Sequence, residues 1–177
     1  MSELFVKDRI LSDYIIDDLK FDAKHLPSYE AGLEGVGIDK SKRSAFIKRL
    51  DPNEYPELCR SLERFAYQFN SKHDPNKLIL KELDYLRYGI SDHHKFHEDA
   101  IPNENPKEVR RFTTVTLLDK SDDLEGGDLL LLDRDENQIS TNLQVGETVI
   151  FYSTTYHGVT PITKGQRRSL IGWIYDR

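Results

Sequence analysis

The residues of this sequence best suited to chemistry are two histidines and an aspartate. His97 and Asp99 flank Glu98 just after a strand-like segment, and His157 follows much later in the chain. In an extended chain, residues i and i+2 project from the same face, so His97 and Asp99 can bind one ion while Glu98 points away. His157 lies just beyond the apolar segment 148–152 and is the candidate for a third ligand.

Two imidazoles and one carboxylate match the facial triad of non-haem iron oxygenases, which leaves metal positions open for substrate and oxygen. The bare His-x-Asp pattern is common by chance, but a second pair of residues supports the interpretation. Arg167 and Ser169 share one face of the predicted last strand. A guanidinium matches the two oxygens of a carboxylate, so a dicarboxylic cosubstrate could bind metal at one end and Arg167 at the other. An arginine pair on the surface of an edge strand is the alternative interpretation.

These residues lie in stretches that resemble the iron(II)- and 2-oxoglutarate-dependent dioxygenases, specifically their prolyl 4-hydroxylase-like branch. The most specific stretch is the pattern His-x-Val-x-Pro-Ile-x-x-Gly-x-Arg, which spans residues 157–167. The resemblance runs in the family's order over residues 86–173, about half of the chain. Its other stretches are Leu86–Gly89, His97–Asp99, Arg111–Thr113, Glu125–Leu129 and Gly146–Phe151.

The resemblance implies a double-stranded β-helix, or jelly roll, that binds Fe(II) through His97, Asp99 and His157. It also implies that Arg167, helped by Ser169, holds the distal carboxylate of 2-oxoglutarate. The cofactors would then be Fe(II), 2-oxoglutarate as cosubstrate and O2, with ascorbate as an optional reductant. The implied reaction hydroxylates an unactivated C–H bond and releases succinate and CO2.

Other positions bear on the pocket around this centre. Tyr88 resembles the family tyrosine that lines the cosubstrate or substrate pocket, although a half-buried strand aromatic is nearly as good an interpretation. Leu117 and Leu118 stand where several prolyl hydroxylases have an aromatic residue, which removes one expected cosubstrate hydrogen bond. Arg168 stands where tyrosine is frequent. We expect Leu117, Leu118 and Arg168 near the pocket wall. We also expect residues 98–106 to form a mobile rim next to the metal.

The substrate implied by the resemblance is a peptidyl proline, while a free amino acid or a small metabolite stays open. The presence of Asp99 favours hydroxylation, because related halogenases lack this carboxylate. A zinc hydrolase is a rival, since His93 and His97 would share one face of a helix. However, the glutamate of a His-Glu-x-x-His motif is missing. A non-catalytic jelly-roll binding module is the other rival, and the presence of all four residues of the iron and cosubstrate site disfavours it.

Composition limits the classes of function. With 37% hydrophobic and 32% charged residues, the chain falls in the ordinary globular class. Its 31 acidic against 25 basic residues give a net charge of -6, which disfavours nucleic acid as a partner because phosphate binders carry a basic excess. The longest apolar run, Leu129–Leu132, is far below the roughly 20 residues of a membrane span. A single cysteine and no visible secretory signal predict a cytoplasmic protein without membrane contact.

The elements that must position the site follow from the pattern of apolar residues. We expect one 2-oxoglutarate/Fe(II) dioxygenase domain over 1–177, with a helical N-terminal part at about 1–76 and a jelly-roll core at about 78–177. Helices are predicted at 7–20 and from Asp51–Asn53 to Phe69, with a loop and one short strand at 21–50. Short strands without helices between them indicate a mainly β fold with N-terminal helices, in the α+β class. They are predicted at 78–88, 109–118, 127–133, 147–152 and 167–175.

Overall fold

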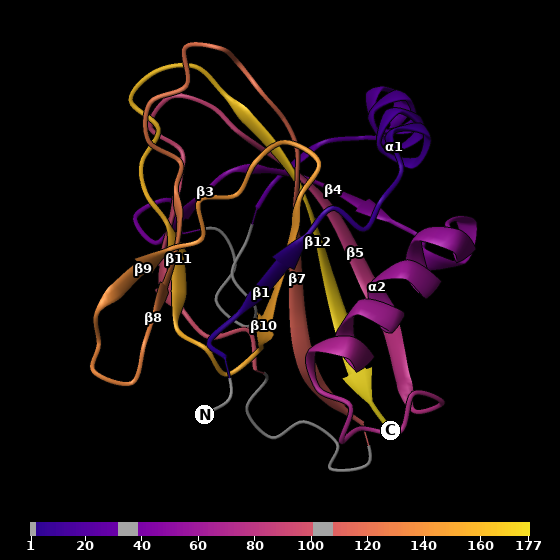
Figure 1. Cartoon of the computed structure of the whole chain (residues 1–177). Helices are drawn as coiled ribbons and strands as arrows, with labels where there is room; N and C mark the ends of the chain where they lie inside the picture. Colours follow the sequence, from indigo (N-terminus) through magenta and orange to yellow (C-terminus); the bar gives the residue numbers. More distant parts are fainter. Residues whose placement is uncertain (1–2, 32–38, 101–107) are drawn as a thin grey trace.

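The computed structural model describes residues 3–31, 39–100 and 108–177, and it forms two antiparallel sheets that face each other (Figure 1). The large sheet has seven described strands in the order β1 (Val6–Asp8), β10 (Thr148–Tyr152), β7 (Val109–Lys120), β12 (Arg167–Asp176), β5 (Leu78–Tyr88), β4 (Phe46–Leu50) and β2 (Tyr29–Glu30). The small sheet has five, in the order β3 (Arg43–Ser44), β6 (His93–His97), β11 (His157–Val159), β8 (Leu129–Leu132) and β9 (Gln138–Ser140). The predicted jelly roll is thereby confirmed.

Two α-helices cover the face of the large sheet that is turned away from the small sheet (Figure 1). Helix α1 spans Asp13–His25, and Ser12 is its N-cap residue: the Ser12 hydroxyl accepts a hydrogen bond from the amide of Ile15. Helix α2 (Pro56–Phe69) follows a short 3-10 turn, η1 (Pro52–Glu54). Proline in its first turn suits a helix start, because that position needs no amide donor. Within the described residues, no helix has the length and apolar character needed to cross a membrane.

The apolar core has two layers, one on each face of the large sheet. Under the helices, buried residues of α1 and α2 pack against side chains of β5, β7 and β12, with Leu62, Phe112 and Ile174 at the centre. Between the sheets, two smaller groups pack around Leu86 and Phe151. Because strand residues alternate between faces, β5 and β12 present one set of side chains to the helices and another to the space between the sheets.

The sequence predicted the long elements correctly and missed several short ones. Helix α2 and the strands β5, β7, β8, β10 and β12 lie where they were expected. The first helix was placed too early, since β1 occupies the start of the predicted 7–20 segment and α1 extends to His25. Segment 21–50 also holds β2, β3 and β4 rather than one short strand. Strands of two to five residues are too short to show a clear period. The short strands β8 and β10 were found because they are runs of mainly apolar residues, whereas β6, β9 and β11 are not and were missed.

Candidate active site

Antiparallel pairing of β6 with β11 brings the three candidate ligands together. His97 and His157 are direct partners across this pair of strands. Asp99 follows β6, and its backbone amide donates a hydrogen bond of 2.8 Å to the carbonyl of Ser153. The Nε2 atoms of His97 and His157 each lie 3.4 Å from one oxygen of the Asp99 carboxylate. One candidate ligand atom from each residue lies within 4.8 Å of the other two, so three residues far apart in sequence form one cluster.

The hydrogen bonds of the two imidazoles suit metal binding. His97 Nδ1 donates to the carbonyl of Lys95 at 2.9 Å, and His157 Nδ1 donates to the carbonyl of Thr155 at 2.8 Å. Because a carbonyl only accepts, each ring carries a hydrogen on Nδ1, which leaves Nε2 as the ligand atom; a metal would bind there in place of any proton on Nε2. Metal–ligand bonds of about 2.1 Å at right angles put ligand atoms about 3 Å apart, close to the spacing around Asp99. The side chains present therefore fit a divalent transition metal.

The charge of Asp99 is stabilised inside the protein. Burial alone would raise the pKa of its carboxyl group, but the charge and hydrogen bonds of His157 and His97 hold that pKa well below its usual range. Burial works to lower the pKa of His157, and the Asp99 carboxylate outweighs it and raises that pKa. Thr113 Oγ1 also donates a hydrogen bond of 2.8 Å to Asp99 Oδ2. An ionised, oriented carboxylate is the form that a metal cation requires.

Arg167 lies on β12, between the sheets, with 5% of its surface exposed. Its Nη2 and Nε donate hydrogen bonds of 2.8 and 3.3 Å to the hydroxyl of Ser169, and its Nη1 donates to the carbonyl of Gly127. Burial lowers the pKa of its guanidinium, and attraction from Tyr88 and Asp128 opposes that shift. Within the described residues no carboxylate forms an ion pair with Arg167. A buried cation in this state is well suited to an anionic ligand, because burying an uncompensated charge is costly.

One cavity between the sheets joins the metal cluster to this arginine. Tyr88, on β5, is the direct partner of Arg167 across the strands, and the guanidinium carbon lies 5.9 Å from the centre of its ring. Tyr88 is buried and lines the cavity, so it is more than a half-buried strand aromatic. All six residues singled out from the sequence line this cavity: Tyr88, His97, Asp99, His157, Arg167 and Ser169. Apolar residues such as Leu86, Val115, Leu129 and Ile171 complete its wall.

His94 also lines the cavity, and the sequence analysis did not identify it. Its ring stacks on that of His97 with 3.6 Å between centroids. His94 faces the cavity because the register of the β6–β11 pair is irregular: Lys95 and Phe96 together lie opposite Gly158. Such a β-bulge turns a side chain to the other face of its strand. A Cβ on Gly158 would lie 2.9 Å from the carbonyl oxygen of His94, so the glycine makes room for the bulge.

The structure does not form the helical His93–His97 pair of the zinc-hydrolase interpretation. Both residues lie on strand β6, and His93 is absent from the cavity lining and from the cluster of metal-ligand candidates. The imidazole of His93 instead lies 3.1 Å from the carbonyl oxygen of Ser91. The residue pattern that suggested a zinc site therefore has no geometric counterpart here.

The expectation that Leu118 and Arg168 lie near the pocket wall is wrong. Arg168 projects from the opposite face of β12 to Arg167 and forms an ion pair with Asp119 at 2.5 Å. Leu118 is fully buried in the core beneath the helices. Leu117 lines a small neighbouring cavity that also reaches Arg167. Adjacent strand residues face opposite sides, which explains both errors.

The predicted rim at 98–106 is described only up to residue 100. Residues 101–107 lie outside the described part of the chain. The mobility expected for that rim therefore stays a prediction.

Comparisons with known proteins identify the family of this chain. Residues 83–175, more than half of the chain, match the family model of the 2OG-Fe(II) oxygenase superfamily. A PKHD-type hydroxylase of Psychrobacter sp. (strain PRwf-1) is 27% identical over 146 residues, which cover 79% of this chain and 55% of that relative. The alignment thus spans about half the length of that curated relative.

Solved structures extend the similarity to nearly the whole chain. A prolyl-4-hydroxylase of Pseudomonas putida has a TM-score of 0.75 at 18% identity, covering 99% of this chain and 94% of that one. A prolyl hydroxylase of Trichoplax adhaerens, solved with a hypoxia inducible factor oxygen degradation domain peptide fragment, has a TM-score of 0.71 at 17% identity. That match covers 98% of this chain and 84% of the other. At these identities the two structures support the fold.

Substitution of the two histidines on β6 tests the metal cluster. We expect His97→Ala to weaken binding of Mn(II) by more than about 100-fold, because losing a direct ligand costs more than losing an outer partner. His93→Ala should leave that affinity unchanged. Isothermal titration calorimetry measures both values without any turnover. The reverse pattern, with His93→Ala losing the metal and His97→Ala keeping it, would show that the ligand assignment is wrong.

Proposed function

The chain belongs to the 2OG-Fe(II) oxygenase superfamily, and on that premise we propose that it is a hydroxylase that uses Fe(II), 2-oxoglutarate and O2. The observation that carries the proposal is the single cavity in which the His97, Asp99 and His157 cluster shares a wall with the buried guanidinium of Arg167. A metal-binding end and an anion-binding end in one cavity suit a dicarboxylate that binds both.

Each end of the cavity has a separate role in the proposed reaction. His97, Asp99 and His157 would hold Fe(II) on one side and leave the other side open to cosubstrate and O2. Arg167 would bind the distal carboxylate of 2-oxoglutarate through its planar guanidinium, and Ser169 would fix the position of that group. The chemistry supplied by the bound iron and cosubstrate converts substrate, 2-oxoglutarate and O2 into hydroxylated substrate, succinate and CO2.

The walls of the cavity support the same reaction. Its apolar side chains limit the entry of water, which strengthens the attraction between Arg167 and a carboxylate. Thr113 and the carbonyls that orient the two histidines fix the ligand cluster before any ligand arrives. Asp99 fills the carboxylate position whose loss accompanies halogenation, so its presence favours hydroxylation.

For the substrate we propose a prolyl residue of a peptide or protein. The curated relative is named a PKHD-type hydroxylase, and two similar structures are named prolyl hydroxylases, one of them solved with a peptide fragment. A free amino acid or small metabolite is the second candidate, because the cavity residues fix the cosubstrate more than the substrate.

Paired peptides test the proposed substrate class. Among proline-containing peptides of mixed sequence, we expect some to gain one oxygen atom with one succinate released per oxygen added. Matched peptides with proline replaced by alanine should remain unmodified. Mass spectrometry and succinate quantification measure the two products. Hydroxylation of free L-proline or another small molecule, with every peptide untouched, would support the second candidate. A complete lack of 2-oxoglutarate turnover with Fe(II) present would contradict the proposed function.

The neighbouring arginines on β12 give a matched test of the cosubstrate site. Arg167→Ala should raise the KM for 2-oxoglutarate by about 10-fold or more, because a charge-assisted hydrogen bond contributes about 1.5–3 kcal/mol. Arg168→Ala should leave that KM within about twofold of wild type, since its side chain lies on the other face of the sheet. Steady-state succinate formation measures both. Equal effects of the two substitutions would refute the assignment of Arg167.

A further inference from the structure

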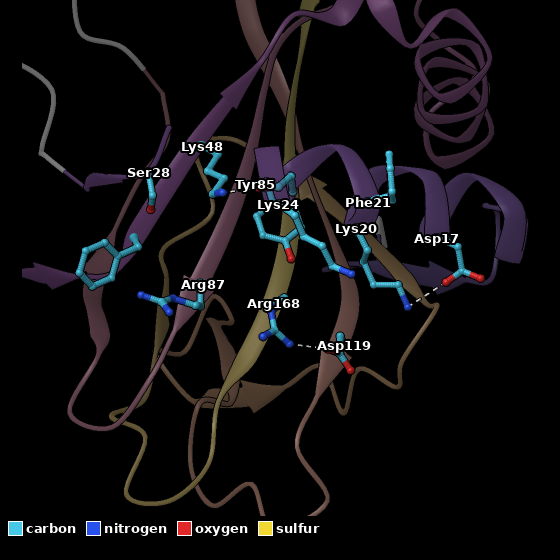
Figure 2. A pocket seen from close by; sticks show the side chains of 12 residues that line it. Asp17, Lys20, Phe21, Lys24, Ser28, Lys48, Tyr85, Arg87, Asp119 and Arg168 are labelled. Carbon is cyan, nitrogen blue, oxygen red and sulfur yellow. Dashed lines mark hydrogen bonds and ion pairs between the residues drawn. The ribbon is translucent and has the colours of Figure 1, made fainter. Parts of the chain in front are cut away.

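A second cavity, of about 640 Å³, lies on the outer face of the large sheet (Figure 2). Helix α1 forms one wall, and strands β4, β5 and β12 supply the rest together with Asp119 at the end of β7. Arg87 on β5 and Arg168 on β12 line this outer cavity. Their neighbours in sequence, Tyr88 and Arg167, line the proposed active site on the other face of the sheet. The two cavities are therefore back to back and separated by the sheet.

The lining of this outer cavity is strongly cationic. Among the described residues, two acidic side chains line the cavity, Asp17 and Asp119, against five basic ones from four elements: Lys20, Lys24, Lys48, Arg87 and Arg168. The whole chain, in contrast, carries a net charge of -6. Cations gathered in a concave site on an acidic protein focus a positive potential there, which attracts anions.

Three of the five basic groups are already used within the protein. Lys20 forms an ion pair with Asp17 at 2.9 Å, and Arg168 forms one with Asp119 at 2.5 Å, as the dashed lines in Figure 2 show. Lys48 donates a hydrogen bond of 2.8 Å to the carbonyl of Leu26. Of the five basic residues, Lys24 and Arg87 remain.

Lys24 and Arg87 have no carboxylate partner among the described residues. Lys24 is exposed on the last turn of α1, and Arg87 is exposed on β5. The guanidinium carbon of Arg87 lies 4.8 Å from the centre of the Phe46 ring, a contact that orients the group and leaves its hydrogen-bond donors available. Both side chains project into the cavity in Figure 2. They form a pair of available cations on opposite walls.

Size and charge indicate what kind of anion fits. The volume is that of a small-molecule site, since such pockets measure about 300–1,000 Å³. An extended polyanion would have to pass helix α1, which carries Asp13, Asp17, Asp18 and Asp22. The lining also offers aromatic surface from Phe46, Tyr85 and Phe21, whose ring is 60% exposed. These features favour a compact anion with a flat apolar part.

We propose that this outer cavity is a binding site for a small organic anion, whose phosphate or carboxylate group is attracted by the available charges of Lys24 and Arg87 and whose aromatic or apolar part packs on Phe46. This site is distinct from the proposed active site and does not depend on the function assigned there. Both cations add to the positive potential of the cavity, and an anionic group that reaches either of them gains a charge-assisted hydrogen bond.

Titration with phenyl phosphate and with phthalate tests the proposal and distinguishes the two anionic groups. We expect wild-type protein to bind at least one of them, measured by isothermal titration calorimetry. The double variant Lys24→Gln and Arg87→Gln should weaken that binding by about 10-fold or more, because the variant lacks both available charges and so loses at least one charge-assisted hydrogen bond. The matched control, Arg60→Gln with Lys72→Gln, removes two exposed charges elsewhere and should bind as wild type does.

The variant Arg167→Ala separates this site from the proposed active site. Binding of the probe should persist in Arg167→Ala, whatever becomes of 2-oxoglutarate turnover. If circular dichroism shows that the double variant does not fold, the single variant Lys24→Gln replaces it as the test. This variant changes one exposed residue on a helix surface and should also weaken binding of the probe. Three results would each overturn the proposal: no binding of either probe at millimolar concentrations, unchanged binding in a folded Lys24→Gln and Arg87→Gln variant, or binding lost only in Arg167→Ala.

Discussion

The candidate metal site depends on one largely buried carboxylate, that of Asp99. Asp99 lies between two imidazoles just beyond the end of β6, and an isolated charge at such a position would cost several kcal/mol. His97 and His157 offset this cost, and Thr113 donates a hydrogen bond to the carboxylate, while the backbone amide of Asp99 donates to the carbonyl of Ser153. Arg110 also donates a hydrogen bond to the carbonyl oxygen of Asp99. The pairing of β6 with β11 therefore stabilises the Asp99 carboxylate, because it brings His97 and His157 next to it.

The alternation of side chains along strand β12 explains how one element lines two cavities. Arg167 and Ser169 face the space between the sheets, where a buried guanidinium is held ready for an anion. Arg168 faces the outer cavity and is neutralised by Asp119. The two adjacent arginines thus have different electrostatic environments. Arg167 has no carboxylate partner within the described residues, whereas Arg168 is paired with Asp119. This contrast is why the two positions serve as test and control for the cosubstrate site.

Much of this arrangement was predictable because it follows from period and residue chemistry. The His-x-Asp spacing places two ligands on one face of an extended chain, and the Arg-x-Ser spacing does the same for Arg167 and Ser169. The long strands and helix α2 carry enough residues to show their period. The third candidate ligand, His157, could be named because it begins a pattern that resembles a known family.

What was missed depends on contacts between segments distant in sequence. His94 enters the cavity only because a bulge opposite Gly158 changes its face, and no local pattern around His94 signals that bulge. Strands β1 to β4 have two to five residues each and are defined by their partners more than by their own composition. The error at Arg168 came from treating a position in a motif as a position in the pocket, although its side chain faces the other side of the sheet.

The central claim is that Asp99 with two histidines holds iron in the same cavity where Arg167 holds 2-oxoglutarate. The most direct measurement is an anaerobic titration of metal-free protein, first with Fe(II) and then with 2-oxoglutarate, followed by visible absorption. The account predicts a weak charge-transfer band that needs both additions and is absent in Asp99→Ala. No band in wild-type protein that has bound both components, or an unchanged band in Asp99→Ala, would contradict it.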